Sequence, residues 1–171
     1  MKSQYRVVVI GGGVVGASII YHLAKMGWSD ICLIERSVLT AGSSWHAAGG
    51  VHALNADPNI SALQAYTIDL LGKIEEESGQ SVGMHMTGGL TLAGTPDRWE
   101  WLQSAYRVYQ SIGIDDVRLV TPEEAGAMCP VLSTDGIIGG LWADREGYVD
   151  TTGTVLAYAG AAKKDGATVI E

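Results

Sequence analysis

The feature that most constrains this sequence is a glycine-rich turn between an apolar run and a helical pattern. Residues 5–10 read Tyr-Arg-Val-Val-Val-Ile, which predicts a strand buried on both faces, as in a parallel sheet. The turn that follows carries the pattern G-x-G-x-x-G, made by Gly11, Gly13 and Gly16. Apolar residues then recur at helical spacing over 14–26, and a second apolar run, 31–34, ends at Glu35. This order predicts the strand–helix–strand unit of a doubly wound α/β fold.

Each glycine of the pattern has its own physical reason. We expect Gly11 to allow the tight turn out of the strand and Gly16 to let the helix pack closely on that strand. Gly13 leaves room for a pyrophosphate to approach the backbone. The N–H groups of the first helical turn would then face the phosphates, and the helix dipole would favour their negative charge. The pattern therefore predicts a dinucleotide-binding loop.

An acidic residue at the end of the second predicted strand supports this interpretation. Glu35 follows Gly16 by about 20 residues, where a carboxylate can accept hydrogen bonds from the ribose hydroxyls of adenosine. A carboxylate there disfavours a 2′-phosphate, which argues against NADP and leaves NAD open. The position of the pattern at the extreme N-terminus, and a second glycine segment after it, favour FAD. The alternative is a glycine-rich turn with a solvated Glu35.

The second glycine segment, residues 37–50, reads Ser-Val-Leu-Thr-Ala-Gly-Ser-Ser-Trp-His-Ala-Ala-Gly-Gly. Small residues dominate it, as a backbone requires if it is to run against a large flat ligand. The hydroxyls of Ser43 and Ser44 can bond phosphate or ribitol oxygens. Trp45 and His46 form a bulky pair inside the segment, which we therefore expect to lie against a cofactor.

These motifs, taken in order, resemble the FAD-dependent dimethylglycine and sarcosine dehydrogenases, which are D-amino-acid-oxidase-like flavin oxidoreductases. The resemblance is dense over residues 7–50 and looser beyond. In that family the His of the W-H-x-A-G segment, here His46, carries the flavin covalently through its 8α-methyl group. A larger apolar residue is common in the family where this chain has Gly50. The resemblance implies FAD contacts from the glycine loop, the acid–base pair and the small-residue segment: Gly11, Gly13, Val14, Val15, Gly16, Glu35, Arg36, Gly42, Ser43, Ser44, Trp45, His46, Ala47, Ala48, Gly49 and Gly50.

The chemistry of imidazole is compatible with the role that the resemblance implies for His46. A free histidine is mostly neutral near neutral pH, and the neutral ring is nucleophilic. It can attack the electrophilic 8α position of an oxidised flavin that is bound beside it. The alternative is a histidine packed beside a noncovalent flavin. The other histidines, His22, His52 and His85, receive no role, and we expect no metal site.

The rest of the chain predicts further elements. Residues 60–78 read as an amphipathic helix, with one apolar face made of Leu63, Tyr66, Leu70, Leu71 and Ile74. Strands are expected at 84–93, where Gly88 and Gly89 interrupt the pattern, and at 117–120, 136–143 and 167–170. Helices are expected at 95–111, 121–129 and 151–165, the last one capped by Asp150.

The resemblance implies how these elements divide into domains. Residues 1–58 and 148–171 would form a Rossmann-like, doubly wound FAD-binding domain, still incomplete. Residues 80–145 would be the first part of an inserted, mixed α+β substrate domain. Because the resembled enzymes are several times longer, we expect this chain to be truncated, an N-terminal fragment that is inactive in isolation.

Composition excludes several other classes of protein. The 171 residues hold 11 Lys and Arg against 19 Asp and Glu, a net charge of −8, so no nucleic-acid partner is expected. The longest apolar run, 7–20, is interrupted by glycines and is shorter than the roughly 20 residues of a membrane span. Two cysteines, Cys32 and Cys129, favour a reduced protein with packed thiols. With no targeting segment visible, the expected location is cytoplasmic.

The sequence therefore supports three hypotheses for function. The first is an FAD-dependent oxidation of a small N-methylated amino acid, such as dimethylglycine or sarcosine, by hydride transfer to flavin. The second keeps the fold but uses oxygen as acceptor, as an amine or glycine oxidase. The third is a dinucleotide-binding module without turnover. The resemblance also implies an electron-transfer flavoprotein as acceptor and tetrahydrofolate bound in a later region, and any catalytic base lies beyond Glu171.

Overall fold

The computed structural model describes residues 2, 4–55 and 57–171. The chain forms two compact units, each built from segments that are distant in the sequence. The first unit comprises Met1–Gly49, Asp69–His85 and Tyr148–Glu171, and the second comprises Gly50–Ile68 and Met86–Gly147.

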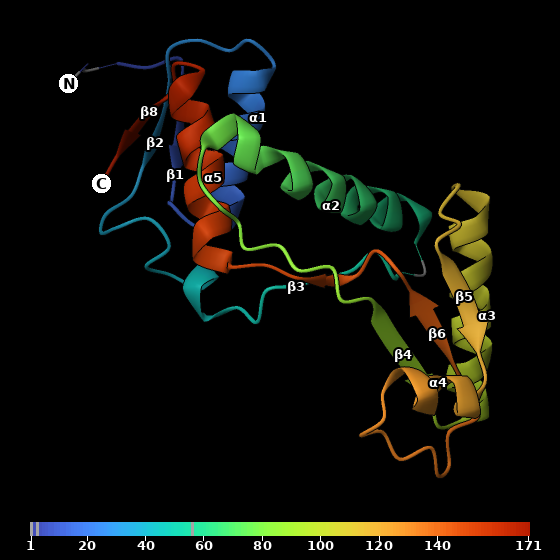
Figure 1. Ribbon diagram of the computed structural model, residues 1–171. Coiled ribbons are helices and arrows are strands. Elements are labelled where there is room, and N and C mark those ends of the chain that lie inside the picture. The colour runs from blue at the N-terminus through green and yellow to red at the C-terminus, as the bar shows by residue number, and fades with distance from the viewer. Residues whose placement is uncertain (1, 3, 56) are drawn as a thin grey trace. The chain divides into compact units, whose positions relative to one another are not determined.

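A parallel sheet forms the centre of the first unit. Its strands lie in the order β1 (Val7–Ile10), β2 (Ile31–Ile34) and β8 (Thr168–Ile170). Helices α1 (Val14–Lys25) and α5 (Thr151–Lys164) pack against each other on one face of this sheet (Figure 1). Parallel strands joined through helices confirm the predicted Rossmann-like α/β class.

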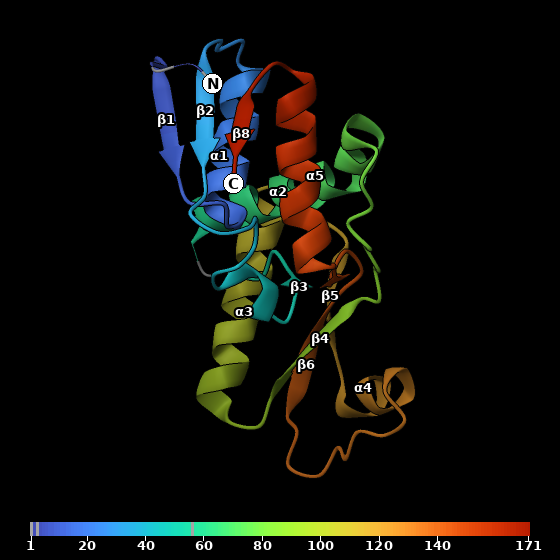
Figure 2. The same ribbon diagram turned by 90° about the vertical axis from the view of Figure 1, so that its left-hand side faces the viewer.

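The prediction that the first strand is buried on both faces was wrong. Val8 is 46% exposed and Ile10 is 82% exposed, while Val7 and Val9 are partly covered. Within the described part of the chain, α1 and α5 cover one face, and the opposite face carries Val8, Ile10 and Ile34. Figure 2 shows α1 behind the strands and α5 beside β8. An apolar run therefore did not distinguish a strand covered on one face from a strand covered on both.

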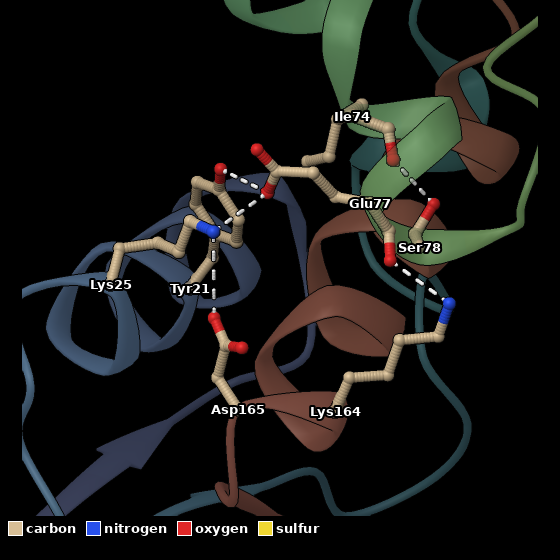
Figure 3. A network of polar contacts seen from close by, with 7 residues as sticks. All are labelled: Tyr21, Lys25, Ile74, Glu77, Ser78, Lys164 and Asp165. Carbon is tan, nitrogen blue, oxygen red and sulfur yellow. Dashed lines mark hydrogen bonds and ion pairs between the residues drawn. The ribbon is translucent and has the colours of Figure 1, made fainter.

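Polar contacts attach the second half of helix α2 (Pro58–Ser78) to α1 and α5 within the first unit (Figure 3). The Glu77 carboxylate accepts a hydrogen bond of 2.8 Å from the Tyr21 hydroxyl and lies 3.1 Å from Lys25 Nζ. Lys164 Nζ donates to the backbone oxygen of Glu77 at 2.9 Å, and Lys25 also lies 3.7 Å from Asp165. Since these groups are partly exposed, the network fixes geometry more than it adds stability.

Helix α2 differs from its prediction in two ways. It begins at Pro58 because the Asp57 side chain accepts hydrogen bonds from the backbone N–H groups of Asn59 and Ile60, which caps the first turn. Its buried stripe also avoids two of the predicted residues, Leu63 and Tyr66, which are 59% and 50% exposed. The helical stripe that contains Leu71 and Ile74 continues instead through Ile68 and Ser61, both of which are buried.

An antiparallel sheet forms the centre of the second unit. Its strands lie in the order β4 (Gly89–Ala93), β6 (Gly139–Ala143) and β5 (Val117–Val120), and α3 (Pro96–Ser111) packs against all three. Both helices of this part begin as the sequence predicts, with a threonine cap followed by proline. In α4 (Pro122–Met128), Thr121 and Glu124 form a reciprocal capping box.

Short pairings complete the secondary structure. Strand β3 (Gly50–Val51) pairs with β7 (Gly147–Tyr148), and the 3-10 helix η1 spans Ser44–His46. His85 forms an isolated bridge with Tyr148, so the predicted strand at 84–93 is divided before β4. No helix within the described residues is long and apolar enough to cross a membrane.

The two units do not have the same bounds as the predicted domains 1–58 with 148–171, and 80–145. Residues 50–58 fall in the second unit, and residues 69–85 fall in the first. The chain passes from one unit to the other inside α2, between Ile68 and Asp69. A helix that contributes to two units has a continuous helical pattern, so this boundary carries no glycine or proline signal in the sequence.

Candidate functional site

The glycine turn has the close helix–strand approach that its sequence predicts. Gly11 has a φ of +105°, a left-handed conformation that favours glycine, and its N–H donates to the Ile34 oxygen at 2.9 Å. A Cβ built on Gly16 would lie 1.9 Å from the Gly11 oxygen. Because real atoms do not approach so closely, α1 can start this near to β1 only with glycine at position 16.

Two grooves open beside this turn, and Ile10 and Gly11 line both of them. The groove beside α1 has a volume of about 380 Å³. The groove beside the end of β2 has a volume of about 330 Å³. Together they bring all the predicted glycine-loop and acid–base residues, and two serines of the small-residue segment, to one place: Gly11, Gly13, Val14, Val15, Gly16, Glu35, Arg36, Ser43 and Ser44. The other predicted residues do not line either groove: Gly42, Trp45, His46, Ala47, Ala48, Gly49 and Gly50.

The N-terminus of α1 supplies hydrogen-bond donors at the groove beside this helix. Its first N–H, on Val14, donates to the Ser44 hydroxyl at 2.9 Å. The following N–H groups, on Val15 and Gly16, have no acceptor inside the helix because they belong to its first turn. Donors at a helix N-terminus favour an anionic group, so this end of the groove fits a phosphate.

The Glu35 carboxylate is held at the edge of the second groove by two backbone donors. Its Oε2 accepts from Gly12 N at 2.8 Å, and its Oε1 accepts from Ser37 N at 2.9 Å. These hydrogen bonds lower the pKa of Glu35, and the one from Gly12 has the largest effect. An ionised carboxylate accepts only, and each oxygen keeps a further lone pair, which suits a ribose diol.

Gly12 was missing from the predicted set, although it organises the loop. Its N–H binds Glu35, and its oxygen accepts from Thr40 N at 2.9 Å. A Cβ at this position would lie 2.6 Å from Leu39 Cδ2 and 3.0 Å from the Glu35 Cβ. The middle glycine of the Gly-Gly-Gly run was the available signal, but the G-x-G-x-x-G pattern leaves this position free.

Trp45 and His46 lie on η1, directly after the serine that caps α1. Their ring centroids are 3.9 Å apart, and Trp45 is 56% exposed. Gly49, at the end of this segment, has a φ of +78°, and a Cβ there would lie 2.2 Å from the Val149 oxygen. The segment is therefore fixed at both ends, by Ser44 and by Gly49, and presents the imidazole of His46 at the surface.

A second polar cluster lies inside the second unit, and the sequence did not reveal it. Tyr109 is fully buried, and its hydroxyl has no hydrogen-bond partner among the described residues. The same holds for Glu146 Oε1, and both side chains line one void of about 10 Å³, enough for one water molecule. Burial, with Asp116 nearby, raises the pKa of Glu146 to about 7. Asp116 itself pairs with Arg145.

No group of three potential ligands (His, Cys, Asp or Glu) gathers around a common point within the described residues, so the fold shows no metal centre there. Both cysteines are free, with Cys32 buried and Cys129 partly buried. The imidazole of His22 lies 2.7 Å from the Ser18 backbone oxygen, and the ring of His85 stacks on Tyr148.

Comparisons with known proteins agree with this geometry. A family model described as DAO, FAD dependent oxidoreductase, matches residues 6–171. The mitochondrial dimethylglycine dehydrogenase of Homo sapiens is 38% identical over 167 residues, which cover 97% of this chain and 19% of that protein. The mitochondrial sarcosine dehydrogenase of Homo sapiens is 34% identical over 172 residues, which cover 100% of this chain and 19% of that protein. The chain thus spans about a fifth of the length of these relatives.

A solved structure extends the likeness to the whole fold. The crystal structure of L-proline dehydrogenase from P. horikoshii matches 100% of this chain and 45% of its own chain, with a TM-score of 0.90 and 29% sequence identity.

Proposed function

Since the chain belongs to the family of FAD dependent oxidoreductases, we propose that it binds FAD along its two grooves and forms part of an amine-oxidising flavoenzyme. The observation that carries the proposal is the arrangement around Gly11. Donors at the N-terminus of α1 lie at one groove, and the ionised Glu35 lies at the other. A dinucleotide needs these two groups, one for its pyrophosphate and one for its ribose.

The residues of the chain bind and orient this cofactor. The N–H groups of the first turn of α1 would hold the pyrophosphate, together with the Ser44 hydroxyl that already contacts this turn. The Glu35 carboxylate would accept hydrogen bonds from the hydroxyls of the adenosine ribose, while the N–H of Gly12 keeps this carboxylate in place. Bound FAD would supply the redox chemistry, as acceptor of a hydride from the carbon next to the amine nitrogen.

We propose a small N-methylated amino acid as substrate, of the dimethylglycine or sarcosine type. The relatives with 38% and 34% identity over nearly the whole chain support this choice, since their names give those substrates. The proposal also includes an electron-transfer flavoprotein as electron acceptor, tetrahydrofolate bound in a later region, and a cytoplasmic location. The human relatives, in contrast, are named as mitochondrial proteins.

The substrate is tested on the complete gene product that carries this chain. We expect turnover of dimethylglycine or sarcosine with an artificial electron acceptor, and slower turnover of glycine. The 171 residues alone should bind FAD without turning over any of the three. Faster turnover with oxygen than with the artificial acceptor would favour an oxidase, and a protein that binds FAD but oxidises none of the three amines would favour a module without turnover.

We also propose that His46 carries the flavin covalently. Its ring is exposed beside Trp45, on the segment that starts at the helix-capping Ser44, so it can meet a ligand that extends along this side of the loop. The imidazole nitrogen would replace one hydrogen of the 8α-methyl group. That hydrogen and the imidazole N–H hydrogen would pass as protons to the flavin ring system, which would take up the two electrons.

His46→Ala is expected to abolish the covalent attachment while the protein still binds FAD reversibly. Mass spectrometry of the denatured complete protein measures the linkage, because only a covalent flavin stays on the polypeptide. His52→Ala is the matched control, since His52 is also exposed and lies only six residues further along the chain. Full attachment of flavin in the His46 variant would assign the linkage to another residue. Absence of attached flavin in the parent protein would exclude a covalent linkage.

A further inference from the structure

The loop after β2 is bound at two points by the end of β8. Glu35 N donates to the Ile170 oxygen at 2.8 Å, which continues the pairing of the two strands. Four residues further on, Leu39 N donates to Glu171 Oε2, also at 2.8 Å. A side chain more than a hundred residues away in the sequence therefore supplies the acceptor for a backbone group in this loop.

The residues that Glu171 holds are those that pack on the glycine turn. Leu39 is only 6% exposed, and its side chain lies against the Cα of Gly12. Thr40 is buried, has a φ of +75° and donates its N–H to the Gly12 oxygen. A β-branched residue rarely adopts such a φ, so the neighbours on both sides must hold it there.

Gly12 in turn holds the Glu35 carboxylate, which lines the groove beside the end of β2. Its N–H donates to Glu35 Oε2, while its oxygen is bound by Thr40. One chain of contacts thus runs from Glu171 to Leu39 and Thr40, on to Gly12, and from there to Glu35. Every residue of this chain lies in the first unit.

We propose that Glu171 is a positioning residue for the dinucleotide site, because its carboxylate holds the Leu39–Thr40 segment against Gly12 and so fixes the place of Glu35. The proposal rests on the proposed FAD binding, but the contact that it invokes exists without the cofactor. Hydrogen bonds from a backbone N–H to an ionised carboxylate are among the stronger ones in proteins. Removing the acceptor leaves the N–H of Leu39 without a partner next to a strained residue.

Amide hydrogen exchange measured by NMR on the chain, residue by residue, tests the positioning directly. We expect Glu171→Ala to raise the exchange rates of the Leu39 and Thr40 amides about tenfold, while the amides of α1 stay as protected as before. Glu171→Gln keeps an accepting oxygen and should restore most of the protection. The matched control is Glu76→Ala, which removes an exposed acid of α2 in the same unit.

Titration of the same variants with FAD, followed by flavin fluorescence, tests the consequence for binding. Glu171→Ala should raise the dissociation constant for FAD about tenfold. The dissociation constant of Glu171→Gln should stay close to that of the parent chain. The proposal is overturned if Leu39 exchange in Glu171→Ala equals that of the control. It is also overturned if exchange rises equally throughout α1, which indicates general destabilisation, or if FAD affinity is unchanged. A parent chain that binds no FAD defeats the proposed function, and the Leu39 exchange then still decides whether Glu171 holds the loop.

Discussion

Gly16→Ala is expected to destabilise the chain by about 3 kcal/mol or more, whereas Gly72→Ala should stabilise it by roughly 0.5–1 kcal/mol. Both glycines lie in helices, Gly16 in the first turn of α1 and Gly72 in the interior of α2, so helix propensity alone does not disfavour alanine at either position. A new Cβ at position 16 would lie 1.9 Å from the Gly11 oxygen, but at position 72 nothing lies within 4 Å. Urea unfolding followed by circular dichroism measures both changes.

The same pair of variants separates the packing role of Gly16 from its effect on the cofactor site. To accept the methyl group, α1 must move away from the turn at Gly11, which displaces the N–H groups that line the groove. FAD affinity should therefore fall in Gly16→Ala even at low temperature, where the variant is still folded, and stay unchanged in Gly72→Ala. Equal stability of the two variants would show that the close approach of helix and turn is not required.

The sequence predicted the local parts of this fold well because local rules determine them. Glycine spacing, an acid after the second strand and the Asp150 helix cap are all readable within a few residues. The strands at 31–34 and 117–120 have the predicted bounds, since polar or turn-forming residues flank their short apolar runs.

The contacts that complete the candidate site were not predictable, because they join distant segments. Nothing near Leu39 in the sequence indicates that Glu171 accepts its N–H. Gly12 occupies a free position of the motif, and only the packing of Leu39 on it shows why a side chain is excluded. In α2 the prediction followed the largest apolar residues, whereas the buried stripe includes a serine, Ser61, whose hydroxyl binds the Ala53 oxygen. Such choices depend on tertiary contacts rather than on periodicity.

The second prediction with a large expected effect concerns Glu146. We expect its ionisation to lower the free energy of unfolding as the pH rises through neutrality. Burial, with Asp116 nearby, raises its pKa from 4.5 to about 7, so the folded chain keeps a proton that the unfolded chain has already released. Between these two values the folded state binds more protons, and the free energy of unfolding therefore falls as the pH rises. The stabilisation is complete below pH 4.5 and is lost once the pH exceeds about 7.

Glu146→Gln should remove this dependence, since the amide resembles the protonated acid and does not ionise. Relative to the parent chain, the variant should gain about 1–3 kcal/mol of stability between pH 4.5 and pH 8. The matched control is Glu100→Gln, an exposed acid of α3 in the same unit. Urea unfolding at a series of pH values measures both.

Other ionisable groups do not obscure this result. Glu35 and Glu75 have lowered pKa values, through hydrogen bonds from Gly12 N and the Ser81 hydroxyl respectively. Their stabilisation is therefore lost only as the pH falls below about 4.5, outside the window of Glu146. The remaining ionisable groups are present in all three proteins, so their contributions cancel in the difference between variant and parent. A difference that stays constant from pH 4.5 to pH 8 would mean that Glu146 ionises in the folded chain as it does in water, and that its carboxylate is solvated rather than enclosed beside Tyr109.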